Sequence, residues 1–127
     1  MAELRYFNPN PNGSRVGDCV IRAISAVTGQ DWNSTYTGAA LQGYILGDMP
    51  SANHVWRAYL TSKGFQRAII PDACPDCYTV DDFANDHPKG RFVLGTGNHA
   101  VAVVDGMVWD TWDSRNEIPI YYFYKEE

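Results

Sequence analysis

Residues 97–113 read GNHAVAVVDGMVWDTWD, and this stretch predicts a β-hairpin. At its centre stands Asp105-Gly106, a pair typical of the type I′ turn, which requires a positive φ at both central residues. The flanking segments 99–104 and 107–112 are rich in residues that favour strands. A two-residue turn then fixes which residues of the two strands lie opposite each other.

The predicted register places His99 opposite Trp112 and Val101 opposite Asp110. Because side chains alternate between faces and paired residues share a face, these four residues fall on one side of the hairpin. Asp113 falls on the other side, unless a bulge shifts the strand by one residue and exchanges Asp113 for Asp110. The imidazole of His99 thus lies diagonal to a carboxylate, which can hold its tautomer and stabilise its charged form. A strand histidine beside a surface aspartate, with no chemical role, also explains the pattern.

A second informative stretch lies 80 residues upstream, around Cys19. Asp18 is a candidate N-cap for a helix from about Cys19 to Thr28, and Gly29 is a typical C-terminal stop. Cys19 then occupies the first turn, where free backbone N–H groups and the helix dipole stabilise a thiolate, although the charge of Asp18 opposes this. The alternative is a small buried cysteine that only packs.

The rest of the chain predicts further helices, followed by strands. Asp31 and Ser51 are expected to cap two helices, and Thr79 starts a short helix through a variant of the capping box. Residues 1–17 are expected to be irregular, and strands are expected at 65–70, 91–94 and 118–124. This order predicts one α+β domain over 1–127, with N-terminal helices packed on a C-terminal antiparallel sheet.

Composition excludes several classes of protein. The chain has 127 residues, a net charge of −5 and only ten Lys and Arg residues, which are scattered, so a nucleic-acid partner is not expected. No apolar run approaches a membrane span and no signal-peptide pattern is present, so the predicted compartment is the cytoplasm of a cell or of a host. Three cysteines do not make a disulfide framework.

Cys19, His99 and Asp110 supply a nucleophile, a base and an orienting group. A thiol with a pKa of about 8.5 is only a few per cent thiolate at neutral pH, so a nearby imidazole must take its proton. A carboxylate then holds the imidazole, and hydrogen-bond donors must meet the oxyanion of the tetrahedral intermediate. The backbone N–H of Cys19 is one candidate donor.

Three segments together resemble the small papain-like cysteine peptidases: GDCVIRAI at 17–24, NHAVAV at 98–103 and DTW at 110–112. In that fold the cysteine begins the central helix, the histidine lies on a strand, and an Asn or Asp follows one hairpin later. The resemblance implies Cys19 as nucleophile, His99 as base, Asp110 as orienting residue and Trp112 as the ring that covers the His–Asp bond. Small proteins of this kind are similar to ones encoded by bacteriophages and gut bacteria.

The resemblance has one departure. The family usually carries a glutamine about six residues before the cysteine as an oxyanion donor, whereas this chain has Gly13 there. Asn12 is the nearest amide that could replace it, and Asn8 and Asn10 lie further away. Asp18 is an auxiliary candidate because of its position beside the thiol.

The function expected from this resemblance is a hydrolase that cleaves a peptide or isopeptide bond of a protein substrate, with no cofactor. The same triad could instead transfer an acyl group or deamidate glutamine. A binding module on a papain-like frame, for example a phage protein that engages a host partner, is the alternative from another class. The sequence does not determine the oligomeric state.

Cys74-Pro75-Asp76-Cys77 is the other motif that we considered. It could be half of a zinc site or a redox pair, but a closed zinc site needs four ligands and no second pair follows. A loop with two thiols is the favoured interpretation, so no metal is predicted. His54 and His87 are expected to be a helix residue and a turn residue.

Overall fold

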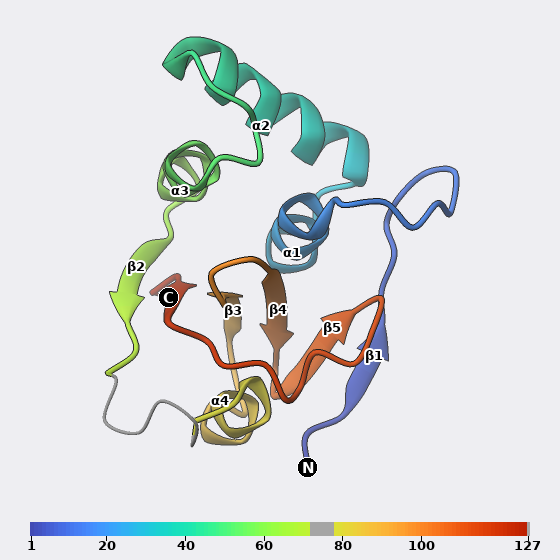
Figure 1. Cartoon of the computed structure of the whole chain (residues 1–127), viewed down its shortest axis with the longest axis vertical. Helices are drawn as coiled ribbons and strands as arrows, with labels where there is room; N and C mark the ends of the chain where they lie inside the picture. The colour runs from blue at the N-terminus through green and yellow to red at the C-terminus, as the bar shows by residue number, and fades with distance from the viewer. Residues whose placement is uncertain (72–77, 127) are drawn as a thin grey trace.

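The computed structural model describes residues 1–71 and 78–126 (Figure 1). In these residues the chain forms four helices and six strands, which confirms the α+β class. The helices are α1 (Cys19–Thr28), α2 (Trp32–Leu46), α3 (Asn53–Ser62) and α4 (Val80–Asp86). The strands are β1 (Leu4–Tyr6), β2 (Gln66–Ile69), β3 (Arg91–Gly95), β4 (Ala100–Val104), β5 (Met107–Asp110) and β6 (Tyr121–Tyr124). No helix in the described ranges combines the length and the apolar character that crossing a membrane requires.

The strands form a single mixed sheet in the order β1-β5-β4-β3-β6-β2. All neighbours are antiparallel except β1, which runs parallel to β5. The prediction of a purely antiparallel sheet was therefore wrong, as was the prediction that residues 1–17 are irregular throughout. A three-residue strand has too short a pattern to be seen in the sequence, and β1 exists because β5 offers it a free edge.

The central hairpin has the predicted turn and register. Asp105 has a φ of 49° and Gly106 a φ of 79°, the left-handed values that a type I′ turn needs. Val104 pairs with Met107 and Ala102 with Trp109, as a two-residue turn at this position requires.

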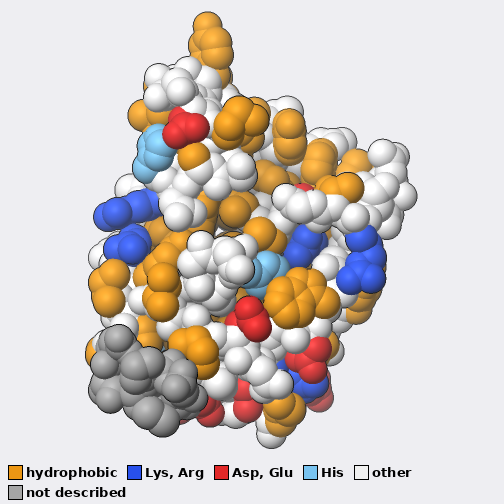
Figure 2. Space-filling model, in the orientation of Figure 1, with side chains coloured by type: hydrophobic (Ala, Val, Ile, Leu, Met, Phe, Trp, Pro, Cys, Tyr) orange, Lys and Arg blue, Asp and Glu red, His pale blue; other side chains and the backbone are white. Residues whose placement is uncertain are grey.

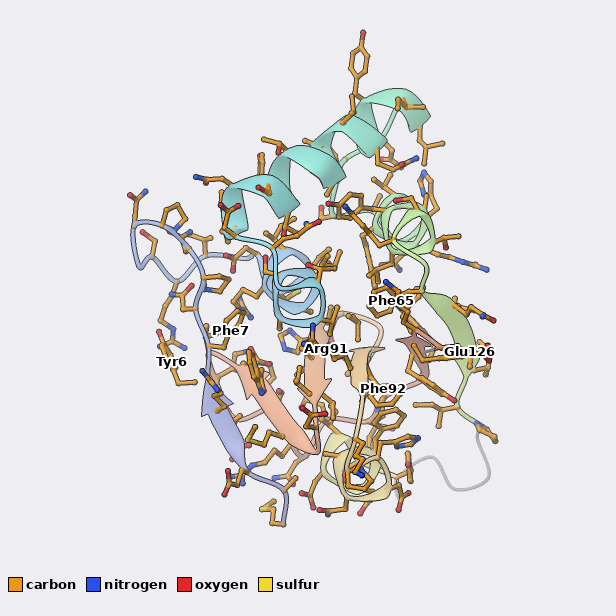
Figure 3. All side chains as sticks on the ribbon, turned by 180° about the vertical axis from the view of Figure 1, so that it is seen from behind. Tyr6, Phe7, Phe65, Arg91, Phe92 and Glu126 are labelled. Atoms are coloured by element: carbon orange, nitrogen blue, oxygen red, sulfur yellow. The ribbon has the colours of Figure 1, made fainter. Side chains whose placement is uncertain are left out.

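Two apolar clusters hold the sheet between its helices. The helices α1, α2 and α3 pack on one face around Ile24, Leu60 and Phe123, and α4 packs on the other face through Val80 and Phe83. In the view from behind, Phe65 lies beside α3 and Phe92 lies toward α4 (Figure 3). Because α1 is buried along most of its length, its first residue is held firmly against the sheet.

Several predicted helix ends are confirmed. Gly29 ends α1 with a φ of 74°, the Asp31 carboxylate accepts a hydrogen bond from the Ser34 N–H at 2.7 Å, and Thr79 forms a capping box with Asp82. Two predicted helix starts differ in the structure. The side chain of Asp18 makes no capping hydrogen bond, because its carboxylate bonds Arg22 and Trp32. The N-cap of α3 is Ala52 and not the predicted Ser51.

Candidate active site

The fold brings Cys19, His99 and Asp110 to one place. Cys19 is the first residue of α1, His99 directly precedes β4, and Asp110 is the last residue of β5. His99 Nε2 lies 2.7 Å from Asp110 Oδ2, and the imidazole and the Cys19 side chain line one cavity, close enough for each to shift the pKa of the other. With Nε2 engaged by the carboxylate, Nδ1 is the ring nitrogen left for the thiol.

The surroundings favour a thiolate–imidazolium pair. Burial raises the pKa of Cys19, but hydrogen bonds from His99 and the Ala100 N–H, with the charges of His99 and Arg22, lower that pKa overall. Burial lowers the pKa of His99, but its hydrogen bonds to Asp110 and Cys19 outweigh this and raise the pKa to about 9. Each group thus stabilises the charged form of the other.

Asp110 is fixed by four hydrogen-bond donors. Its Oδ2 accepts bonds from His99 and from Ser114 Oγ at 2.7 Å each, and its Oδ1 accepts from Arg22 Nη2 at 3.0 Å and the Thr111 N–H at 2.7 Å. Burial raises the pKa of this carboxyl, but the hydrogen bonds from His99 and Ser114 outweigh burial. The net effect is a lowered pKa for Asp110. Asp110 is therefore an ionised, oriented partner for the imidazole.

Arg22 connects this carboxylate to Asp18. One guanidinium nitrogen bonds Asp18 Oδ1 and another bonds Asp110, and Trp32 Nε1 donates to Asp18 Oδ2 at 2.9 Å. Asp18, a predicted auxiliary residue, thus lines the same cavity as Cys19, with its charge compensated by Arg22. The sequence prediction missed Arg22. Its place in a helix that is buried from Val20 to Val27 was the available signal, because a buried arginine needs a carboxylate partner.

Trp112 lies where the register places it. Its ring centroid is 4.7 Å from that of His99, so the indole covers one side of the imidazole while remaining 40% exposed. Asp113 points away and pairs with Arg115, whose Nε lies 2.8 Å from Asp113 Oδ1. Of these two carboxylates, Asp110 is the one that contacts His99.

The predicted oxyanion amide is not part of this arrangement. Asn12 is exposed in the N-terminal loop and does not line the cavity above the thiol. The Asn8 side chain donates to backbone carbonyls of the same loop, and Asn10 Oδ1 accepts from the Asn12 N–H at 2.9 Å. The side-chain amides that do line the cavity belong to Asn53 and Asn98, which sequence reasoning did not single out.

A cavity of about 590 Å³ opens above the thiol. Cys19, His99 and Ala100 line it together with residues of α2, of α3 and of the segment between these helices. Figure 2 shows hydrophobic side chains gathered over these helices in the upper half of that face. The large or apolar side chains that line the cavity include those of Trp32, Tyr36, Met49, Pro50, Trp56 and Tyr121.

The other two histidines do not join the site. Cys74 and Cys77 lie outside the described residues, so the loop with two thiols stays a prediction, with the zinc half-site and the redox pair as its alternatives. Within the described part of the chain, no three His, Cys, Asp or Glu side chains are grouped to hold a metal ion. His54 lies 3.4 Å from Asp48 on the surface, and His87 bonds the Phe83 carbonyl at the end of α4.

Comparison with known protein families, with curated proteins and with solved structures finds no match for this chain.

Proposed function

We propose that this protein is a thiol hydrolase of the papain-like type, which cleaves a peptide or isopeptide bond through an acyl-enzyme at Cys19. The observation that carries the proposal is the position of His99, which is hydrogen-bonded to a buried carboxylate and lies close enough to Cys19 for each group to shift the pKa of the other. This is the order of groups that nucleophilic catalysis by cysteine requires. The cavity above the thiol gives a substrate room to approach.

In the acylation step, the Cys19 thiolate attacks the carbonyl carbon and forms a C–S bond. The oxyanion meets the Cys19 N–H, one of the first N–H groups of α1, which have no partner within a helix. The His99 imidazolium then gives its proton to the leaving amine as the C–N bond breaks, which leaves a thioester and neutral His99.

In the deacylation step, neutral His99 takes a proton from water while the oxygen attacks the thioester. The C–S bond breaks, the acid product leaves, and the thiolate–imidazolium pair is restored. Throughout, Asp110 keeps the imidazole oriented and stabilises its positive charge. Transfer of the acyl group to an amine instead of water would make the protein a transferase, which product analysis distinguishes.

The test is the reactivity of the thiol as a function of pH. In a Cys74→Ser, Cys77→Ser background, the rate of alkylation by iodoacetamide should remain high well below pH ~8.5, the ordinary thiol pKa. His99→Ala should abolish this low-pH reactivity. Asn12→Ala should leave it unchanged, because Asn12 lies outside the cavity. A thiol of ordinary pH dependence, indifferent to His99, would contradict the proposal and favour the binding module.

A further inference from the structure

We propose that Ser114 is a positioning residue for the Asp110 carboxylate, and that the start of α4 supports this role by holding the segment that carries Ser114. The inference rests on the proposed function and adds to it a residue that acts through Asp110. Ser114 lies outside the three segments that carry the papain-like resemblance, and sequence analysis did not single it out.

The hydroxyl of Ser114 meets the carboxylate in the interior of the protein. Ser114 is 0% exposed, and its Oγ lies 2.7 Å from Asp110 Oδ2. Because an ionised carboxylate can only accept, the hydroxyl is the donor in this bond. The same oxygen accepts the bond from His99 Nε2 at 2.7 Å. Ser114 therefore occupies a second acceptor direction of Oδ2 and restricts how the carboxylate can turn relative to the imidazole.

The segment that carries Ser114 is bonded to the start of α4. After β5 the chain runs past this helix (Figure 1). The first N–H groups of a helix have no partner within it. In α4 the N–H groups of Val80 and Asp81 donate instead to the carbonyls of Glu117 and Arg115, at 2.9 Å each. The Glu117 N–H bonds the Ser114 carbonyl at 3.1 Å, so the backbone that follows Ser114 is fixed to α4.

The side chain of Arg115 secures the same segment. Its Nε and Nη2 each donate to the Asp113 carboxylate at 2.8 Å, and its Nη1 donates to the Ala2 carbonyl at 2.9 Å. The Ala2 N–H in turn donates to Asp81 Oδ1 of α4 at 2.6 Å. Both sequence neighbours of the buried serine are therefore held, and its hydroxyl is preorganised for the carboxylate.

The bond from Ser114 also supports the charge that the mechanism needs. Burial raises the pKa of Asp110, and the hydrogen bonds from His99 and then from Ser114 are the largest effects that lower it. The charged groups that bond this carboxylate are His99 and Arg22, and Arg22 also bonds Asp18. Without the hydroxyl, Asp110 takes up a proton at a higher pH. A neutral Asp110 no longer stabilises the imidazolium, which in turn stabilises the thiolate.

The experiment measures alkylation of Cys19 by iodoacetamide as a function of pH, with the full chain in the Cys74→Ser, Cys77→Ser background. Ser114→Ala should move the acid-side midpoint of the rate profile upward by at least about 0.5 pH unit, which lowers the rate below that midpoint about threefold. Ser114→Thr, which retains a hydroxyl, should restore the wild-type profile. An unchanged profile in Ser114→Ala at a reactive thiol would overturn this inference and leave the proposed function standing. A threonine profile shifted as far as that of alanine would also overturn it.

Ser25→Ala is the matched control. Ser25 is also a buried serine, 2% exposed, and its Oγ lies 3.0 Å from Thr35 Oγ1, so this variant removes the same group and a comparable hydrogen bond. Ser25 lies on α1, the helix that begins at Cys19, but its bond leads to α2. Its pH profile should match that of the wild type. An equal shift in Ser25→Ala and Ser114→Ala would contradict a specific role for Ser114.

A second measurement keeps the inference testable if the thiol proves unreactive. The carbon-13 signal of the Asp110 carboxyl group, assigned by its absence from Asp110→Asn, reports the protonation of this group directly. Its titration midpoint should be higher in Ser114→Ala than in the wild type, and unchanged in Ser25→Ala. An ordinary thiol together with this shift would reject the proposed function and retain Ser114 as the residue that supports the carboxylate. An ordinary thiol with an unchanged midpoint would reject both.

Discussion

At the scale of single residues, Arg22 decides the charge of the candidate site. Its guanidinium joins Asp18, which directly precedes the thiol, to Asp110, which holds the imidazole. Without this cation, two buried carboxylates would face one imidazolium and a thiolate. The positive charge of Arg22 lowers the pKa of the Cys19 thiol, so this cation favours the thiolate.

We therefore expect Arg22→Gln to change both stability and reactivity. Loss of one partner from a buried ion pair should lower the free energy of unfolding by about 3–5 kcal/mol, measured by urea unfolding. The pKa of Cys19, followed by the pH dependence of alkylation, should rise. In the double variant with Asp18→Asn, the pKa should fall back toward its wild-type value because the carboxylate beside the thiol is gone. A Cys19 pKa that ignores both changes would contradict this role for Arg22.

At the scale of elements, the β4–β5 hairpin brings His99 and Asp110 together. Its two-residue turn fixes the register of residues 102–104 against 107–109, and His99 and Asp110, which lie beyond these pairs, are in contact. The turn is also tied to the neighbouring loop, because Asp105 Oδ1 accepts a hydrogen bond from the Gly90 N–H at 3.0 Å. A turn of another type would splay the strands and move the two side chains apart.

Gly106→Ala tests the importance of this turn. A side chain at a φ of 79° costs about 1 kcal/mol or more of unfolding free energy, and the new Cβ would lie 3.3 Å from Pro88 Cα. Gly29→Ala is the matched control, since Gly29 has a φ of 74° but no atom within 4 Å of a Cβ. In urea unfolding, Gly106→Ala should cost more stability than Gly29→Ala; equal losses would show that the contact with Pro88 is easily relieved.

At the scale of the whole molecule, the Cys19–His99 pair affects how the free energy of unfolding depends on pH. His99 has a raised pKa, so its contribution is complete below pH 6.5 and is lost as pH rises through about 9. Cys19 has a lowered pKa, so its contribution is present above 9.0 and is lost as pH falls toward that lowered pKa. Between pH 6.5 and 9 the folded chain holds one proton on His99 and none on Cys19, whereas the unfolded chain holds one on Cys19 and none on His99. Because the proton numbers are equal, the contributions of the two groups to the pH dependence of unfolding free energy cancel.

Removal of the thiol should expose the slope of His99 alone. We expect Cys19→Ala to lose roughly 1–3 kcal/mol of unfolding free energy, relative to the wild type, as pH rises from 6.5 to 9. The comparison by urea unfolding at several pH values cancels the other titrating groups, which both proteins share. Parallel curves for the two proteins would show that Cys19 and His99 are not charged together.

Much of the fold was predictable because its signals are local. The start of α1 at Cys19, its end at Gly29 and the capping box at Thr79 each depend on a few consecutive residues. The strand β1 could not be predicted, since three residues carry too little pattern and their pairing depends on the distant β5. The same limit explains the error at Asp18, whose carboxylate bonds Arg22 and Trp32 instead of the helix N-terminus.

The hairpin and the start of α1 follow from local sequence, and so do the positions of His99, Asp110 and Cys19 within their own elements. Turn chemistry and side-chain alternation act over neighbouring residues, so they can be followed along the chain. Three other features could not be predicted in this way: Arg22 bonds Asp110 across 88 residues, Asn12 lies outside the cavity, and aromatic residues of α2, α3 and β6 line one cavity. These features depend on how the helices pack on the sheet, which no pattern of neighbouring residues encodes.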